Sequence, residues 1–276
     1  AARVSMELRR FGIEIDDSAG MPLAESPAGQ FARLVCIIGT SNYTNADLAA
    51  VLKHQFFRVG QSREKSEKLA LQFEHIALRG QISSPQIGKF ADHLQEIRQK
   101  TSDRSVIRIN HTELEESDWE VLTEWVLAID LIFSDFGKFS SENGLYAPRQ
   151  VFTCLQSTIV QLSQDENTNP VLNDAKGANE LANLFSALSS NHVDEFEFPI
   201  SESYPVFNAL LSGHVYRSTH STHSRLHIYG PLEARLLDND RVILAGLNED
   251  NWPQNHRNDA FLNRSMRRTI GMPSPE

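Results

Sequence analysis

Side chains suited to binding nucleic acid follow an apolar run near the C-terminal end of the chain. Asn248, Glu249 and Trp252 come directly after residues 242–247, which are almost entirely aliphatic. Loops that follow the strands of an open α/β sheet are its usual ligand-binding positions. A tryptophan beside polar groups can stack on a base while its neighbours hydrogen-bond to the sugar–phosphate backbone. The alternative is a turn that the packing of Trp252 holds in place.

Three arginines form a second candidate, on a helix predicted over residues 259–270. Arg264 and Arg268 are four residues apart and therefore share a face of that helix, and Arg267 lies beside them. Guanidinium groups bind phosphate well because their planar fork donates two parallel hydrogen bonds. These arginines could line a channel for single-stranded DNA. The alternative is a solvated helix face, or pairing with Asp259 and with acidic residues elsewhere.

Glu233 and Arg235 lie on a short predicted helix over residues 231–237. Charged pairs at such a corner arise readily for structural reasons, so an ion pair that holds the strand–helix junction is the favoured interpretation. A functional role for the two charges is the alternative.

The chain offers little for metal binding. Its two cysteines, Cys36 and Cys154, lie in apolar helical contexts and are expected to be free thiols in a reducing compartment. A loose group of four histidines has irregular spacing and no cysteine among it, so we expect a solvated loop and not a zinc site; it comprises His214, His220, His223 and His227.

Helices are predicted for most of the chain, because apolar residues recur at spacings of three and four. Ser26 followed by Pro27 is typical of a helix start, Asn45 is the expected cap of the next helix, and Gly39 and Gly271 are expected stops. The predicted helices cover residues 1–11, 26–39, 45–56, 62–78, 84–98, 117–133, 148–162, 177–188, 204–211 and 259–270.

Strand-type sequence is found on both sides of this helical block. Residues 13–15 and 226–229 are short β-type runs. Residues 242–247 are continuously apolar, which is typical of a strand buried on both faces of a parallel sheet. We therefore expect an α/β domain, formed by residues 1–40 and 225–276, that is interrupted by an all-helical insertion at residues 41–224.

Charge is distributed unevenly along the chain, whose net charge is −10. Residues 1–110 hold 15 Lys and Arg against 12 Asp and Glu, residues 111–212 hold 3 against 17, and residues 213–276 hold 8 against 7. The middle third would repel a phosphate backbone, so any contact with DNA is expected at the two ends.

Three stretches, at residues 7–24, 230–253 and 262–276, resemble the AddB family in its alphaproteobacterial form. AddB is the helicase-like subunit of the bacterial AddAB helicase–nuclease and a relative of the UvrD/RecB-type superfamily 1 helicases. The resemblance implies a RecA-like second motor domain with a large helical insertion. The stretches cover under a third of the chain, and the helical middle has no diagnostic motif of its own.

Departures from the active helicase pattern imply that this motor is inactive. Active relatives carry Thr-x-His and Lys-Gly-Leu-Glu where residues 227–235 read HIYGPLEAR, so only Leu232 and Glu233 are kept. The following Gly-Leu-x-Glu is kept at residues 246–249, and no phosphate-binding G-x-x-x-x-G-K-[ST] occurs anywhere. We expect no cofactor in this chain, whereas the complex of the family uses ATP and Mg²⁺.

The resemblance implies a cytoplasmic, non-catalytic module that guides or surveys single-stranded DNA during ATP-dependent processing of double-strand breaks, for recombinational repair. The expected partners are AddA and single- and double-stranded DNA. One alternative is a structural brace that docks AddA and positions the nuclease; another is half of an ATP site completed by a partner domain. No apolar run reaches the roughly 18 residues that a membrane helix needs. The missing initiator Met and the abrupt ends suggest an internal fragment.

Overall fold

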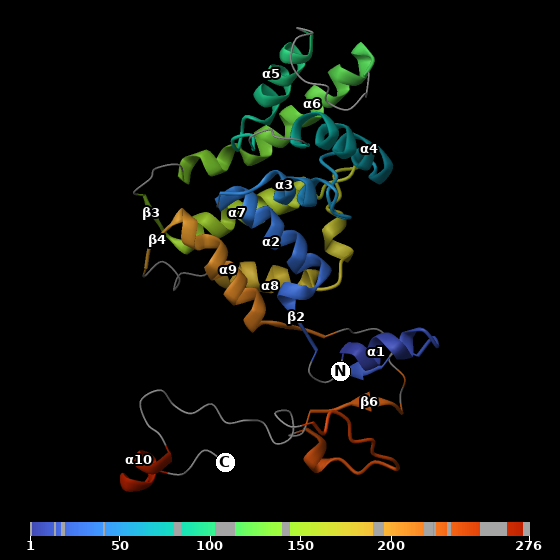
Figure 1. Cartoon of the computed structure of the whole chain (residues 1–276), viewed down its shortest axis with the longest axis vertical. Helices are drawn as coiled ribbons and strands as arrows, with labels where there is room; N and C mark the ends of the chain where they lie inside the picture. The colour runs from blue at the N-terminus through green and yellow to red at the C-terminus, as the bar shows by residue number, and fades with distance from the viewer. Residues whose placement is uncertain are drawn as a thin grey trace. The chain divides into compact units, whose positions relative to one another are not determined.

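The chain forms two compact units, Ala1–Tyr229 and Gly230–Glu276, in a computed structural model (Figure 1). Each unit is described separately. The structure describes residues 2–13, 15–17, 20–40, 42–79, 84–102, 114–139, 144–189, 196–217, 223, 225–230, 233–248 and 264–272.

Nine α-helices are found among the described residues of the first unit. They are α1 (Ala2–Arg9), α2 (Pro27–Thr40), α3 (Asn45–Leu52), α4 (Arg63–Phe73), α5 (Phe90–Ser102), α6 (Glu116–Phe133), α7 (Pro148–Leu162), α8 (Ala178–Leu188) and α9 (Ser203–Gly213). The predicted bounds of α2, α6, α7 and α8 are confirmed to within one residue at each end. A π-helix, η2 (Glu74–Leu78), extends α4, and the short 3-10 helices are η1 (Leu23–Glu25), η3 (Ser134–Phe139), η4 (Val171–Asp174) and η5 (Ile200–Glu202).

Helix α2 lies at the centre of the helical unit. Its neighbours are α3, α7, α8 and α9, as Figure 1 shows. Phe31, Val35 and Ile38 on this helix are almost completely buried. The domain boundary expected at residue 40 therefore does not divide the structure, because α2 belongs to the same core as the helices that follow it.

Stacked aromatic rings fill the core between α7, α8 and α9. The ring of Phe207 lies 5.5 Å from that of Phe152 and 5.6 Å from that of Phe185, both in stacked geometry. All three side chains are at most 3% exposed. Aromatic pairs at this distance stabilise a core beyond the burial of their area.

Two helix starts differ from the sequence prediction. Thr44, and not Asn45, caps α3: its hydroxyl accepts from the Asp47 N–H at 3.2 Å, and Asp47 accepts from the Thr44 N–H in return. Helix α5 begins at Phe90 and not near residue 84. There the carboxylate of Asp130, on α6, accepts hydrogen bonds from the N–H groups of Phe90 and Ala91, both at 2.8 Å.

The start of α2 is a tightly packed corner. The Ser26 hydroxyl accepts from the N–H of Gly29 at 3.0 Å, as the predicted cap requires, and donates to the carbonyl of Leu23 at 2.8 Å. A Cβ atom at Gly29 would lie 1.8 Å from that same carbonyl oxygen. Gly39, the predicted stop, does not end α2; a Cβ there would meet the Phe136 ring at 2.5 Å.

The described strands form three pairs of two residues each. β1 (Asp16–Asp17) pairs in parallel with β6 (His227–Ile228) and so joins the segments that precede and follow the helical block. β2 (Met21–Pro22) pairs antiparallel with β5 (Val215–Tyr216), and β3 (Leu145–Tyr146) with β4 (Phe198–Pro199). A larger RecA-like sheet stays a prediction.

The second unit contains the 3-10 helix η6 (Glu233–Leu236) and α10 (Arg264–Thr269). The buried strand expected at residues 242–247 is wrong for this structure: the segment is not a strand, and Val242, Ile243 and Leu244 are 65%, 82% and 73% exposed. A strand of this composition needs hydrogen-bonded neighbours and covered faces, and no described strand pairs with it.

None of the helices in the part of the chain that the structure describes is long and apolar enough to cross a lipid bilayer.

Candidate functional site

The predicted DNA-binding residues lie in the second unit, and the structure describes part of them. Asn248 is exposed, after the apolar segment, whereas Glu249 and Trp252 lie outside the described residues. Arg264 begins α10, and its side chain is also outside the description. The predicted stop of this helix at Gly271 is confirmed: its φ is +71°, and the Met272 N–H donates to the Arg267 carbonyl at 2.9 Å.

Arg267 and Arg268 occupy the last turn of α10. Arg268 is exposed, and Arg267 is partly exposed, with an Nε–H that has no hydrogen-bond acceptor among the described residues. Neither guanidinium group is within ion-pair distance of a described carboxylate. Pairing with Asp259 falls outside the described residues. The two cations are thus available to an external anion as far as the described surroundings go.

Glu233 and Arg235 behave as parts of a corner. The Glu233 carboxylate accepts a hydrogen bond from the backbone N–H of Gly230 at 3.2 Å, which fastens the turn before η6. Arg235 is exposed on the same short helix. Glu233 therefore holds the backbone of this corner. Neither Glu233 nor Arg235 lines the groove between α5 and α6 or the smaller pocket beside α4 and α6.

The histidines form no described metal centre. His214 lies with Nδ1 2.8 Å from the Leu210 carbonyl, and His227 stacks on Tyr229 at 5.4 Å. His220 is outside the described residues. Within those residues, no group of three or more His, Cys, Asp or Glu side chains could hold a metal ion.

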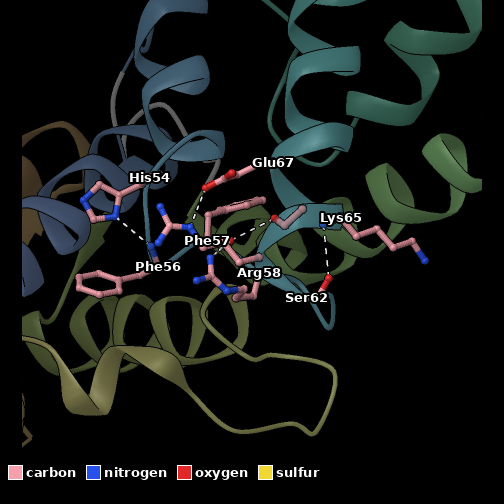
Figure 2. A network of polar contacts seen from close by, with 9 residues as sticks. His54, Phe56, Phe57, Arg58, Ser62, Lys65 and Glu67 are labelled. Atoms are coloured by element: carbon pink, nitrogen blue, oxygen red, sulfur yellow. Dashed lines mark hydrogen bonds and ion pairs between the residues drawn. The ribbon is translucent and has the colours of Figure 1, made fainter.

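The segment between α3 and α4 holds two titratable residues that the sequence did not single out, the half-buried His54 and the buried Arg58 (Figure 2). His54 stacks on Phe31, with ring centroids 4.9 Å apart, and its Nδ1 accepts a weak hydrogen bond from the Phe56 N–H at 3.4 Å. Burial lowers the pKa of His54 to about 4. The ring is therefore neutral at physiological pH and serves as part of the aromatic core.

Arg58 lies four residues further on and is 8% exposed. Its guanidinium donates to the carbonyl of Phe57 at 2.9 Å, in the network of Figure 2. The N–H groups of Arg58 and Val59 both donate to the Leu162 carbonyl, at the end of α7. Burial, with help from the nearby charge of Arg63, lowers the pKa of Arg58. These contacts attach the segment between α3 and α4 to α7. Val59 in this segment has a left-handed φ of +51°, which is a strained conformation for a β-branched residue.

Glu74 is another buried charge, at the start of the π-helix. Lys53 and Arg79 bind its carboxylate at 2.9 Å and 3.2 Å. Burial alone would raise the pKa of Glu74, but the hydrogen bonds and charges of the two cations hold it below the ordinary value. The cluster clamps α3 to the π-helix, which the charges in the sequence could not reveal, since the three residues are spread over 27 positions.

Acid should weaken the first unit through His54. Its pKa in the folded protein lies below the ordinary value of 6.5, so the unfolded chain binds the proton more readily and stability is lost as pH falls from about 6.5 towards 4. We expect this ring to contribute on the order of 1–2 kcal/mol to that loss, less than the full shift implies because the ring is partly exposed. Urea unfolding at pH 7 and pH 4.5 should show a smaller acid-induced loss in His54→Phe than in the wild type. An identical loss in both proteins would show that His54 does not contribute.

Comparison of the chain with protein-family models, with curated proteins and with solved structures yields no match. In the described part of the chain, the most strongly shifted pKa values belong to groups that pack within the helical unit. Arg267 and Arg268 of α10 are predicted DNA-binding residues with no described carboxylate as an ion-pair partner.

Proposed function

We propose that the chain is a non-catalytic, helicase-like module of the AddB type that guides single-stranded DNA during the processing of double-strand breaks for recombinational repair. The observation that carries the proposal is the pair Arg267 and Arg268 at the end of α10, which no described carboxylate neutralises. The kept Leu232–Glu233 and Gly246–Glu249 positions of the helicase pattern support it.

In this proposal, the second unit contacts DNA without nucleotide turnover. Guanidinium groups of α10 bind phosphates, the amide of Asn248 hydrogen-bonds to the strand, and Trp252 stacks on a base. ATP and Mg²⁺ belong to the motor of the partner subunit, AddA. This division of labour is consistent with a sequence that lacks the glycine-rich loop and lysine that bind triphosphates.

The RecA-like sheet belongs to the same proposal. The parallel direction of the β1–β6 pair is the direction that such a sheet requires. Deuterium exchange offers a check: the amides of residues 16–17 and 227–228, which form the parallel pair, should be protected, and rapid exchange there would contradict the sheet.

A structural brace is the second candidate, and charge favours it. Residues 111–212 hold 17 acidic against 3 basic side chains, so the helical block suits a protein partner better than a phosphate backbone. In that role, the chain docks AddA and positions the nuclease, and the α10 arginines serve solubility or protein contacts.

Binding of labelled single-stranded DNA to the chain, with and without ATP, separates these functions. DNA guidance predicts binding at low salt that weakens steeply as salt rises, because phosphate contacts release counterions. ATP should change nothing. Absence of binding at low salt, with association with AddA intact, would instead establish the brace; nucleotide binding by the chain alone would revive the half-site for ATP.

A further inference from the structure

A polar groove lies between α5 and α6 on the first unit. It has a volume of about 880 Å³. Its walls are formed by Gln95, Arg98 and Gln99 of α5 and by Glu120, Thr123 and Glu124 of α6. The two helices pack directly against each other, so these walls have a fixed spacing.

Arg98, the one cation among the described wall residues, is already neutralised. Nη2 of Arg98 lies 2.6 Å from each carboxylate oxygen of Glu116, and its guanidinium stacks over the Trp119 ring at 5.2 Å. Glu120 and Glu124, by contrast, form no ion pair with a described residue. The groove therefore presents two free carboxylates and net negative charge.

Exposed leucines continue the same face of α6. Leu127 and Leu131 are 51% and 76% exposed and follow Glu124 by three and seven residues, which places all of them on one side of the helix. The opposite side of α6 packs into the core of the first unit, where Leu122, Trp125, Val126, Ile129 and Phe133 are buried. The outer stripe is thus acidic in its N-terminal half and apolar in its C-terminal half.

We propose that this stripe, Glu120–Glu124–Leu127–Leu131, docks a basic amphipathic helix of a partner protein. Lys or Arg side chains of that helix pair with Glu120 and Glu124, and its apolar side chains cover Leu127 and Leu131. A helix that binds in a groove contacts it through side chains three, four and seven residues apart, which is the spacing of this stripe. The pairing of opposite charges then sets the direction in which the bound helix lies. The proposal does not depend on DNA binding by α10, and it supplies the docking surface that the brace function needs.

Length and charge exclude the other occupants. The stripe spans eleven residue steps, or about 17 Å along a helix, so a matching helix has at least about eleven residues. Within the described chain, α1 and α10 carry both arginines and exposed apolar residues, but their eight and six residues cover only about 12 Å and 9 Å, which argues against a second copy. A nucleic acid would place phosphates against unpaired carboxylates.

A synthetic 18-residue helical peptide tests the proposal, with lysines at i, i+4 in one half and leucines in the other. Its binding to the full chain is measured by fluorescence anisotropy, for the wild type and for the pairs Glu120→Gln/Glu124→Gln and Leu127→Ala/Leu131→Ala. Each pair should weaken binding at least tenfold. A matched control, Glu197→Gln/Glu202→Gln, removes two exposed carboxylates elsewhere and should leave binding unchanged.

Several results would overturn the proposal. A scrambled peptide of identical composition should bind at least tenfold more weakly; equal binding would reveal mere charge attraction. Absence of binding at low salt, or equal binding by all variants, would remove the site. If the chain self-associates and Leu127→Ala/Leu131→Ala abolishes this association, the stripe binds a second copy of the chain. If the same variant abolishes binding of single-stranded DNA, the stripe binds nucleic acid. Loss of DNA binding in α10 variants would leave this proposal unaffected.

Discussion

Replacing Gly29 by alanine should destabilise the helical unit by about 3 kcal/mol or more. The added Cβ would lie 1.8 Å from the Leu23 carbonyl oxygen and 3.2 Å from the Ser26 hydroxyl. Because the nearer atom is backbone, no side-chain rotation relieves the clash. The start of α2 must move away from η1, which disrupts the Ser26 cap and the neighbouring core.

Gly213→Ala is the matched control for this change. Gly213 ends α9, no atom lies within 4 Å of the position of its Cβ, and its φ is not positive. Alanine there should leave stability unchanged or raise it by less than about 1 kcal/mol, since it restricts the unfolded chain. Urea midpoints measure both variants. Equal midpoints for Gly29→Ala and the wild type would show that the corner is not packed as described.

Truncating Phe207 to alanine should cost about 3–5 kcal/mol. Its side chain is fully buried and stacks between Phe152 and Phe185, so it joins α9 to α7 and α8. Removal of the ring takes away apolar burial and both aromatic contacts, and leaves a cavity that three packed helices cannot easily close. Thermal and urea unfolding of the variant should show a lower midpoint with an unchanged cooperative transition.

Phe196→Ala supplies the comparison for Phe207. Phe196 is 53% exposed, and among the described rings it contacts Phe198 alone. Its truncation should cost less than about 1 kcal/mol. A loss of stability similar to that of Phe207→Ala would mean that the burial of the two rings does not determine how much each contributes to stability.

The sequence predicts a helix well where the signals for it, the spacing of apolar residues and the capping residue, lie within or beside the helix itself. The 3.6-residue period of apolar positions fixed α2, α6, α7 and α8, and Ser26 was recognisable as a cap. The start of α5 was not predictable, because its cap, Asp130, lies 40 residues away along the chain. Asn45 was mistaken for a cap because Thr44 makes the reciprocal bonds, while the Asn45 amide reaches the Leu78 carbonyl instead.

The site was predictable only in part. Arg267 and Arg268 were evident from residue type and spacing, and their helix ends at Gly271 as expected. The groove between α5 and α6 could not be foreseen, since it requires knowing that residues 95–99 face residues 120–124. Residues 242–247 show the opposite failure: their pattern predicts a strand, but a strand depends on neighbours, and the described chain pairs none with it.

Salt-dependent DNA binding by an arginine variant tests the central proposal most directly. The full chain, as wild type and as Arg267→Ala/Arg268→Ala, is titrated with labelled single-stranded DNA over a range of salt concentrations. Lys138→Ala/Lys176→Ala removes two exposed cations from residues 111–212, where no DNA contact is expected, and is the charge-matched control. We predict weaker binding for the α10 variant, with a slope of log affinity against log salt that is shallower by about 1–2, and no such change beyond general charge loss in the control. The same affinity and slope in the wild type and the α10 variant would contradict DNA guidance by this helix.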